Sequence, residues 1–124
     1  MESNSGQRWE EFTMVIHSEV NRLWPLVKDR TLMPMDLCVA HYLMGQMDIR
    51  TGRIEVRTKD IAEELGLTMS QLTPAMKRLR AEHLLAKGLK GTGYFWMLNP
   101  HYWHVGGSRL HAMRINVFNK LVSE

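Results

Sequence analysis

Polar and cationic side chains recur between residues 68 and 90 in a pattern that suits nucleic-acid binding. They are Thr68, Ser70, Gln71, Thr73, Pro74, Lys77, Arg78, Lys87 and Lys90. Hydroxyl and amide groups can hydrogen-bond to base edges or phosphates, and a proline ring can touch a thymine methyl group. An arginine such as Arg78 can contact guanine through two hydrogen bonds, whereas a lysine typically meets phosphate. We therefore expect this segment to contact double-stranded DNA.

Two short helices are predicted to position these side chains. The first, over 58–65, has an apolar stripe at helical spacing, and Thr58 can serve as its N-cap. Gly66 suits a left-handed cap at its end. Thr68 and Gln71 then fit the capping box that opens a second helix. Two helices joined by a tight turn are a common way to place a helix in the DNA major groove.

The second helix has an apolar side and a polar side. A turn of about 100° per residue places four residues toward the core: Leu72, Met76, Leu79 and His83. The opposite side holds Ser70, Pro74, Lys77, Arg78 and Ala81, flanked by Gln71 and Thr73. Pro74 leaves two possibilities, a kinked helix or a regular helix that begins late with Thr73 as its cap. A solvated polar face without a ligand is the alternative interpretation.

A β-hairpin is predicted after the second helix. Residues 84–87 and 94–98 have strand-like composition, and the glycine-rich tip spans 87–93. Lys87 and Lys90 could reach the DNA backbone or the adjacent minor groove from this tip, unless the hairpin is a plain surface feature. Tyr94 and Trp96 share one strand face, and Phe95 and Met97 share the other. One face must pack on helices, so core packing is favoured over a stacking platform for single-stranded nucleic acid. Helices and hairpin together, over 58–98, predict a winged helix-turn-helix.

Helices are also predicted outside this region. One covers 17–26 and is limited or kinked by Pro25, and another begins at Pro34 and ends near Met47. A short strand over 53–56 could pair with the hairpin. The final helix, over 108–122, has apolar residues on more than one side. We expect Leu110, Met113, Val117 and Leu121 to face the domain, and Ile115, Phe118 and Val122 to support a symmetric homodimer.

Length and composition indicate one domain over residues 1–124, mainly α with a small β-sheet (α+β), with residues 1–7 disordered. The chain has 16 Lys and Arg against 13 Asp and Glu, and residues 50–90 hold nine of the basic and five of the acidic residues. The positive charge thus coincides with the predicted helix-turn-helix and wing, which suits a polyanion partner. No apolar run is long enough to span a bilayer, and no secretory leader is recognisable, so we expect a cytoplasmic protein without a membrane partner.

Catalytic and metal-binding patterns are weak. We expect no catalytic residue, no cofactor and no metal, because nucleophile motifs and paired carboxylates in a glycine-rich setting are missing. His101, His104 and His111 are the only residues spaced like metal ligands, but no nearby Cys, Asp or Glu completes a metal site. Cys38 is the single cysteine, which excludes an internal disulfide, and its apolar neighbours predict a buried side chain.

The region over 58–85 resembles winged helix-turn-helix regulators such as the MarR-like group. A more specific likeness follows it, because Asn99 and Pro100 end a strand before an aromatic pair and a glycine, Tyr102, Trp103 and Gly106. This order, over about 12–122, resembles RepL-type plasmid replication proteins. The resemblance implies a DNA-binding protein that starts or maintains replication of a plasmid or other mobile element. A dimeric MarR-like repressor and a winged-helix module that binds proteins remain the alternatives.

Overall fold

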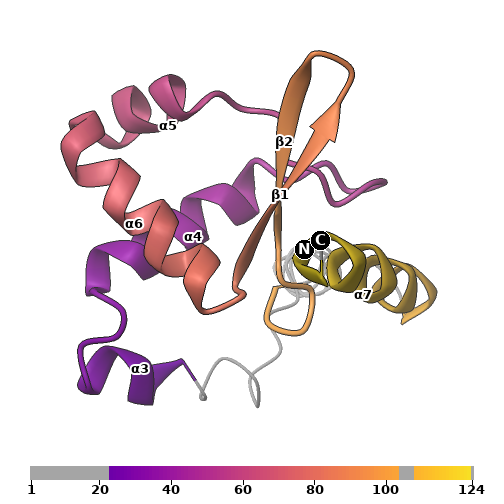
Figure 1. The fold of residues 1–124 in the computed structure, drawn as a ribbon, viewed down its shortest axis with the longest axis horizontal. Helices are drawn as coiled ribbons and strands as arrows, with labels where there is room; N and C mark the ends of the chain where they lie inside the picture. The colour runs from indigo at the N-terminus through magenta and orange to yellow at the C-terminus, as the bar shows by residue number, and fades with distance from the viewer. Residues whose placement is uncertain (1–22, 104–107, 124) are drawn as a thin grey trace, which may run out of the picture.

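The computed structural model describes residues 23–103 and 108–123, and predictions for residues 1–22 lie outside this part of the chain. Its element order is α3 (Trp24–Lys28), α4 (Pro34–Gly45), α5 (Thr58–Leu65), α6 (Met69–Ala81), β1 (Leu85–Lys90), β2 (Gly93–Leu98) and α7 (Ser108–Ser123) (Figure 1). The protein is therefore mainly helical with a two-stranded antiparallel hairpin, as predicted at the level of α+β. None of the helices described is long and apolar enough to cross a membrane.

The α5–α6 pair forms where the sequence predicts two helices. Gly66 ends α5 in a left-handed conformation, with φ of 68°. The N-cap of α5 is Arg57 rather than Thr58, and its side chain makes no capping hydrogen bond. Thr68 caps α6 as predicted, because its side chain accepts a hydrogen bond from the Gln71 backbone N–H at 3.2 Å. Helix α6 begins at Met69, so Pro74 lies inside it and the late-start alternative is wrong.

The hairpin has longer strands and a shorter tip than predicted. Lys90 pairs with Gly93, so only Gly91 and Thr92 form the turn. Lys87 consequently lies within β1, opposite Trp96, and not at the tip. The predicted strand over 53–56 is a single antiparallel bridge, in which Ile54 and Trp96 exchange two backbone hydrogen bonds of 2.8 and 2.9 Å.

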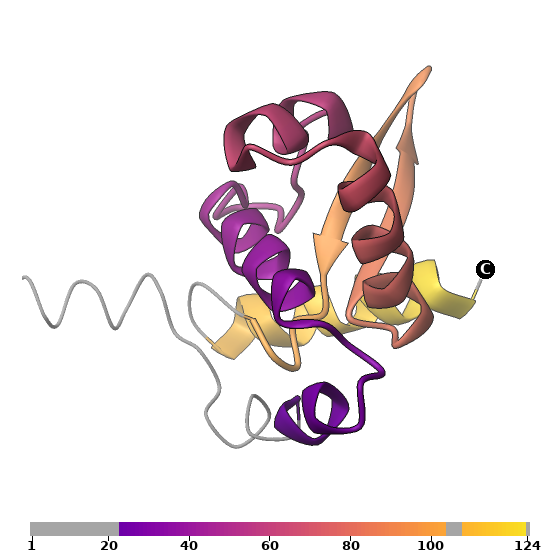
Figure 2. The same cartoon turned by 90° about the vertical axis from the view of Figure 1, so that its left-hand side faces the viewer.

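The sheet lies between two helical layers. Helices α4, α5 and α6 cover one side and α7 crosses the other, while the hairpin tip extends beyond the helices (Figures 1 and 2). Trp96 faces the α4–α6 layer in the main core, and Met97 faces α7 in a smaller cluster with Ala86 and Phe118. This alternation is the period-2 pattern of a strand whose two faces are both covered.

Helix α7 presents a different face to the domain than predicted. Phe118 is 1% exposed and packs against the sheet, whereas Met113 and Val117 are 56% and 43% exposed. Leu121 packs against the same cluster as predicted, but Val122 does so too, so the core-facing side of α7 includes Phe118 and Val122 in place of Met113 and Val117. Because Phe118 is a core residue, it cannot be the dimer contact predicted from the sequence.

An arginine fixes α7 to the turn over 48–52. Arg114 is 4% exposed, and its Nη2 donates a hydrogen bond to the Ile49 carbonyl oxygen. Burial lowers the pKa of Arg114, and the Asp48 carboxylate opposes that shift. Backbone N–H groups of Arg50 and Thr51 donate to Asp48 and lower the pKa of its carboxyl group. The turn is thus held by its own hydrogen bonds and by a buried guanidinium group.

Further predictions concern α4 and the helix before it. Helix α3 begins at Trp24 and continues to Lys28, so Pro25 lies in its first turn and does not end a helix near residue 26; the predicted residues 17–22 lie outside the described part of the chain. Helix α4 starts at Pro34 as expected and ends at Gly45, two residues before Met47. Cys38 is exposed, so the prediction of a buried thiol is wrong. Asp36, Val39, Ala40 and Leu43 define the buried face of α4, and position 38 lies about 200° around the helix from position 36. Helical periodicity, and not the apolar neighbours of Cys38, decides its exposure.

Candidate nucleic-acid interface

The outward side of α6 is exposed as the sequence predicts. Every residue placed there except Arg78 is exposed: Ser70, Gln71, Thr73, Pro74, Lys77 and Ala81. Leu72, Met76 and Leu79 are buried on the opposite side, together with Ala75. His83 is the exception among the predicted core residues, because it lies beyond the end of α6 with φ of 56° and is exposed.

Gln71 is shared between the outward side and the capping box. Its Oε1 accepts a hydrogen bond of 3.0 Å from the Thr68 backbone N–H. A bidentate contact to adenine needs both ends of the amide group. Such a contact would therefore have to break the capping box, so Gln71 is better suited to a single contact through its Nε2 group.

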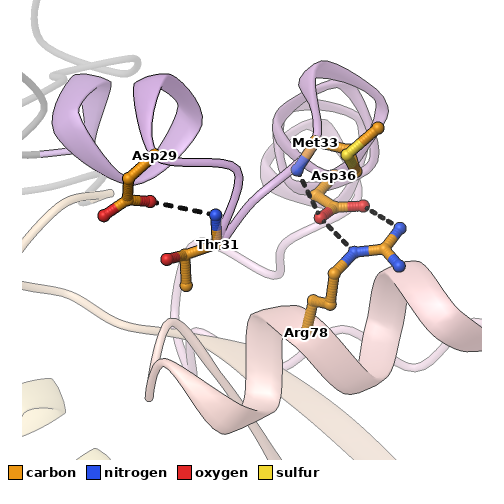
Figure 3. A network of polar contacts seen from close by, with 5 residues as sticks. All are labelled: Asp29, Thr31, Met33, Asp36 and Arg78. Atoms are coloured by element: carbon orange, nitrogen blue, oxygen red, sulfur yellow. Dashed lines mark hydrogen bonds and ion pairs between the residues drawn. The ribbon is translucent and has the colours of Figure 1, made fainter.

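Arg78 is engaged inside the protein. Its Nε and Nη2 donate to the two carboxylate oxygens of Asp36 on α4, at 2.7 and 2.9 Å (Figure 3). The same carboxylate accepts a 2.9 Å hydrogen bond from the Met33 backbone N–H at the start of α4. Asp36 is fully buried, whereas the Arg78 side chain is 34% exposed. This hydrogen bonding raises the pKa of Arg78. A guanine contact through the same two nitrogens would require the ion pair to break.

The two hairpin lysines have different surroundings. Lys90 forms an ion pair with Glu55, with 2.6 Å between Nζ and Oε1, and both side chains are about half exposed. Such a surface pair is weak and can exchange partners. The Lys87 Nζ lies 4.4 Å from the centroid of the Tyr94 ring and 5.6 Å from that of Trp96. The ammonium group of Lys87 therefore lies over the Tyr94 and Trp96 rings, on the side of β2 that faces α6.

A groove of about 260 Å³ separates α6 from the hairpin, and we name it the hairpin groove. Its lining residues are Thr58, Met69, Leu72, Thr73, Met76, Lys77, Arg80, Lys87, Tyr94 and Trp96. The set contains three cations and no Asp or Glu. Thr73 and Lys77 belong to both the groove and the outward side of α6, so the two form one continuous surface.

A second hollow lies between the end of α6, β1 and α7. It measures about 420 Å³ and shares the cations Lys77, Arg80 and Lys87 with the hairpin groove, with His83 added. None of its lining residues is acidic either. The three shared cations therefore form a ridge between the two hollows.

The Trp96 indole has an unusual polar environment. The residue is 5% exposed, and its Nε1–H has no hydrogen-bond partner within the part of the chain that the structure describes. A buried donor without an acceptor costs about 1–3 kcal/mol. The Arg80 Cζ lies 5.8 Å from the indole centroid, and Lys87 approaches the same ring. An unsatisfied donor therefore lies beside two cations.

Sequence reasoning missed Arg80, Trp96 and Asp36 as residues of this region. Arg80 lies three residues after Lys77, so helical spacing alone could have placed it on the same side of α6. Asp36 falls on the apolar face of α4, and a carboxylate at such a position signals a buried partner. The indole N–H carries no signal in the sequence, because its environment depends on the hairpin register.

The histidine cluster cannot be assembled from the described residues. His104 lies outside them, and a His111 ring nitrogen lies 2.6 Å from the Pro100 carbonyl oxygen. Within 23–103 and 108–123, no group of three or more His, Cys, Asp or Glu side chains is arranged to hold a metal ion.

Comparisons with profiles of known protein families, with curated proteins and with solved structures found no match for this chain.

Proposed function

We propose that this protein binds double-stranded DNA as a winged helix-turn-helix domain, with α6 as the recognition helix and the β1–β2 hairpin as the wing. The observation that carries the proposal is the acid-free ridge of Lys77, Arg80 and Lys87 between the exposed side of α6 and the hairpin. A phosphate backbone is the polyanion that such a ridge would bind, and a helix of 13 residues fits the major groove.

The contacts follow from the exposed residues. Thr68, Ser70, Gln71, Thr73 and Pro74 at the start of α6 would meet base edges or the adjacent phosphates. Lys77 and Lys87 would meet the backbone, and Lys90 would do so by exchanging Glu55 for phosphate. Arg78 would contribute by fixing α6 to α4 through Asp36.

The resemblance to RepL-type proteins extends the proposal to replication or maintenance of a plasmid or other mobile element. A dimeric transcriptional regulator would use the same contacts, and fold alone does not distinguish the two tasks. Selection of bound sequences from random DNA would give the preferred site. The natural position of that site, at a replication origin or at an operator, would then distinguish the two tasks.

A labelled 30-base-pair duplex and its separate single strand test the proposal by fluorescence anisotropy. The wild-type protein should bind the duplex more tightly than the single strand. Lys77→Gln should weaken duplex binding several-fold, whereas Lys28→Gln, which removes the same charge from exposed α3, should not. Equal effects of the two substitutions would show that α6 has no special part in binding.

A further inference from the structure

We propose that the hairpin groove is a seat for one backbone phosphate of the bound DNA, formed by Arg80, Lys87 and the indole N–H of Trp96. The inference rests on the proposed function and names the groups that would grip the DNA strand crossing between α6 and the wing. It assigns a binding task to Arg80 and Trp96, neither of which is among the DNA contacts predicted from the sequence.

The first support is charge. Lys77, Arg80 and Lys87 line the groove, and the lining contains no carboxylate to neutralise them. Lys90 differs, since its charge is paired with Glu55 near the hairpin tip. The groove is therefore where the hairpin side of the molecule offers cations to an outside anion. An oxyanion with several acceptor oxygens can be shared by two or more such cations.

The second support is the buried Trp96 donor. Its Nε1–H lacks an acceptor among the described residues, in a side chain that is 5% exposed. Arg80 and Lys87 lie near the same indole, at 5.8 and 5.6 Å from its centroid. An anion drawn in by these cations would bring acceptor oxygens to the indole. Because the Nε1 atom is buried, an anion reaches it only after side chains around the indole move, and Arg80 and Lys87 have flexible aliphatic stems that allow such movement.

The third support is the start of α5 at the edge of the groove. Thr58, the first residue of α5, lines the groove, and the Arg57 N-cap offers no side-chain hydrogen bond. The first backbone N–H groups of a helix have no partners within that helix and favour an anion. Asp60 lies in the first turn of α5 but is not among the groove-lining residues.

The occupant would be a phosphate of a DNA strand and not an isolated small anion. The groove is continuous with the exposed side of α6 through Thr73 and Lys77. A duplex with its major groove on α6 and its minor groove toward the hairpin must pass its backbone between them. The hairpin groove occupies that position.

Indole N–H resonances of the ¹⁵N-labelled protein test the seat directly. Trp96→Phe identifies the Trp96 signal by its loss, and the exposed Trp24 serves as an internal control. Duplex DNA should move the Trp96 signal downfield and leave that of Trp24 in place. Inorganic phosphate alone should produce a smaller movement of the same signal at much higher concentration.

The Arg80 variants supply a readout that a purely structural role would not give, and Trp96→Phe tests the indole contact beside them. Arg80→Gln should reduce the slope of log affinity against log salt by about 0.9, and Arg80→Lys should restore it. Trp96→Phe should weaken duplex binding several-fold without changing the slope, because no charge is removed.

Failure of the phosphate seat and failure of DNA binding would give different results in these experiments. Duplex binding with an unmoved Trp96 signal and an unchanged Arg80→Gln slope would overturn the phosphate seat while leaving DNA binding intact. If the wild-type protein binds no duplex, the proposed function fails. The phosphate titration then decides whether the groove binds an anion, and an unmoved Trp96 signal there overturns the seat as well.

Discussion

The Asp36–Arg78 pair gives the most quantitative prediction. Asp36→Asn removes the charge of a fully buried side chain but keeps an oxygen that can accept the Met33 N–H. Breaking a buried ion pair from one side typically costs about 3–5 kcal/mol. Because the Arg78 side chain is 34% exposed, water can partly replace the lost carboxylate. We therefore expect Asp36→Asn to cost about 2–3 kcal/mol.

Removing the arginine side of the pair should cost more stability than removing the carboxylate charge. Arg78→Met keeps an unbranched side chain on α6 but leaves the Asp36 carboxylate buried with only the backbone N–H of Met33. We expect a loss of about 3–5 kcal/mol. For a chain of this length, each kcal/mol corresponds to about 3–5 °C in Tm. The two variants should therefore melt well below the wild type and remain distinguishable from each other.

The double variant completes the cycle. Asp36→Asn/Arg78→Met removes both charges, so its cost should be less than the sum of the single costs by about 2 kcal/mol. Chemical denaturation followed by circular dichroism measures all four proteins. Additive costs, with no coupling within error, would refute the argument that these two side chains stabilise the α4–α6 contact as a pair.

The same proteins test the part of Arg78 in DNA binding. If Arg78 acts through Asp36, the double variant should bind duplex DNA with the sequence preference of the wild type at a temperature where both are folded. If Arg78 instead reads a guanine, the double variant should lose about 1–3 kcal/mol of discrimination at one base position.

Four other features of the fold lead to separate predictions. Gly88→Ala should lower stability by about 1–3 kcal/mol, because a Cβ there would lie 2.2 Å from the Phe95 ring; a wild-type melting curve would contradict this. Pro74→Ala should raise Tm, because proline is unfavourable inside a helix, and a lower Tm would show that the ring is useful where it is. The pKa of Asp48 is lowered in the folded state, so its stabilising effect is present above about pH 4 and is lost as the pH falls through the folded pKa. Asp48→Asn should therefore flatten the acid side of the stability profile, and an unchanged profile would count against this. If α7 forms the homodimer expected from the sequence, its exposed residues Met113 and Val117, and not Phe118, would supply the contact; Val117→Glu should then disrupt the dimer in light scattering, and a monomeric wild-type protein at micromolar concentration would rule the dimer out.

Local signals in the sequence predicted local structure well. The Thr68–Gln71 capping box and the Gly66 cap each depend on residues within a few positions, and both form as expected. The exposed side of α6 follows from helical spacing alone. These features were accessible because the physical causes lie within one or two turns of chain.

Features that depend on distant partners were harder to predict. Asp36 and Arg78 are 42 residues apart, so neither residue reveals the other. Helix α7 has two apolar stripes, and only the sheet beneath it decides that Phe118 is buried while Met113 is exposed. The position of Lys87 depends on the hairpin register, which places it opposite Trp96 and beside the groove. The candidate site lies where these long-range arrangements meet.

The salt dependence of duplex binding tests the central claim most directly. Anisotropy titrations between 50 and 200 mM salt give the slope of log affinity against log salt for the wild type and for Lys77→Gln/Lys87→Gln. Each phosphate contact contributes about 0.9 to that slope, so the double variant should lose about two such contributions and bind more weakly at every salt concentration. A wild-type protein that does not bind duplex DNA at 50 mM salt, or a double variant with the wild-type slope and affinity, would contradict the account.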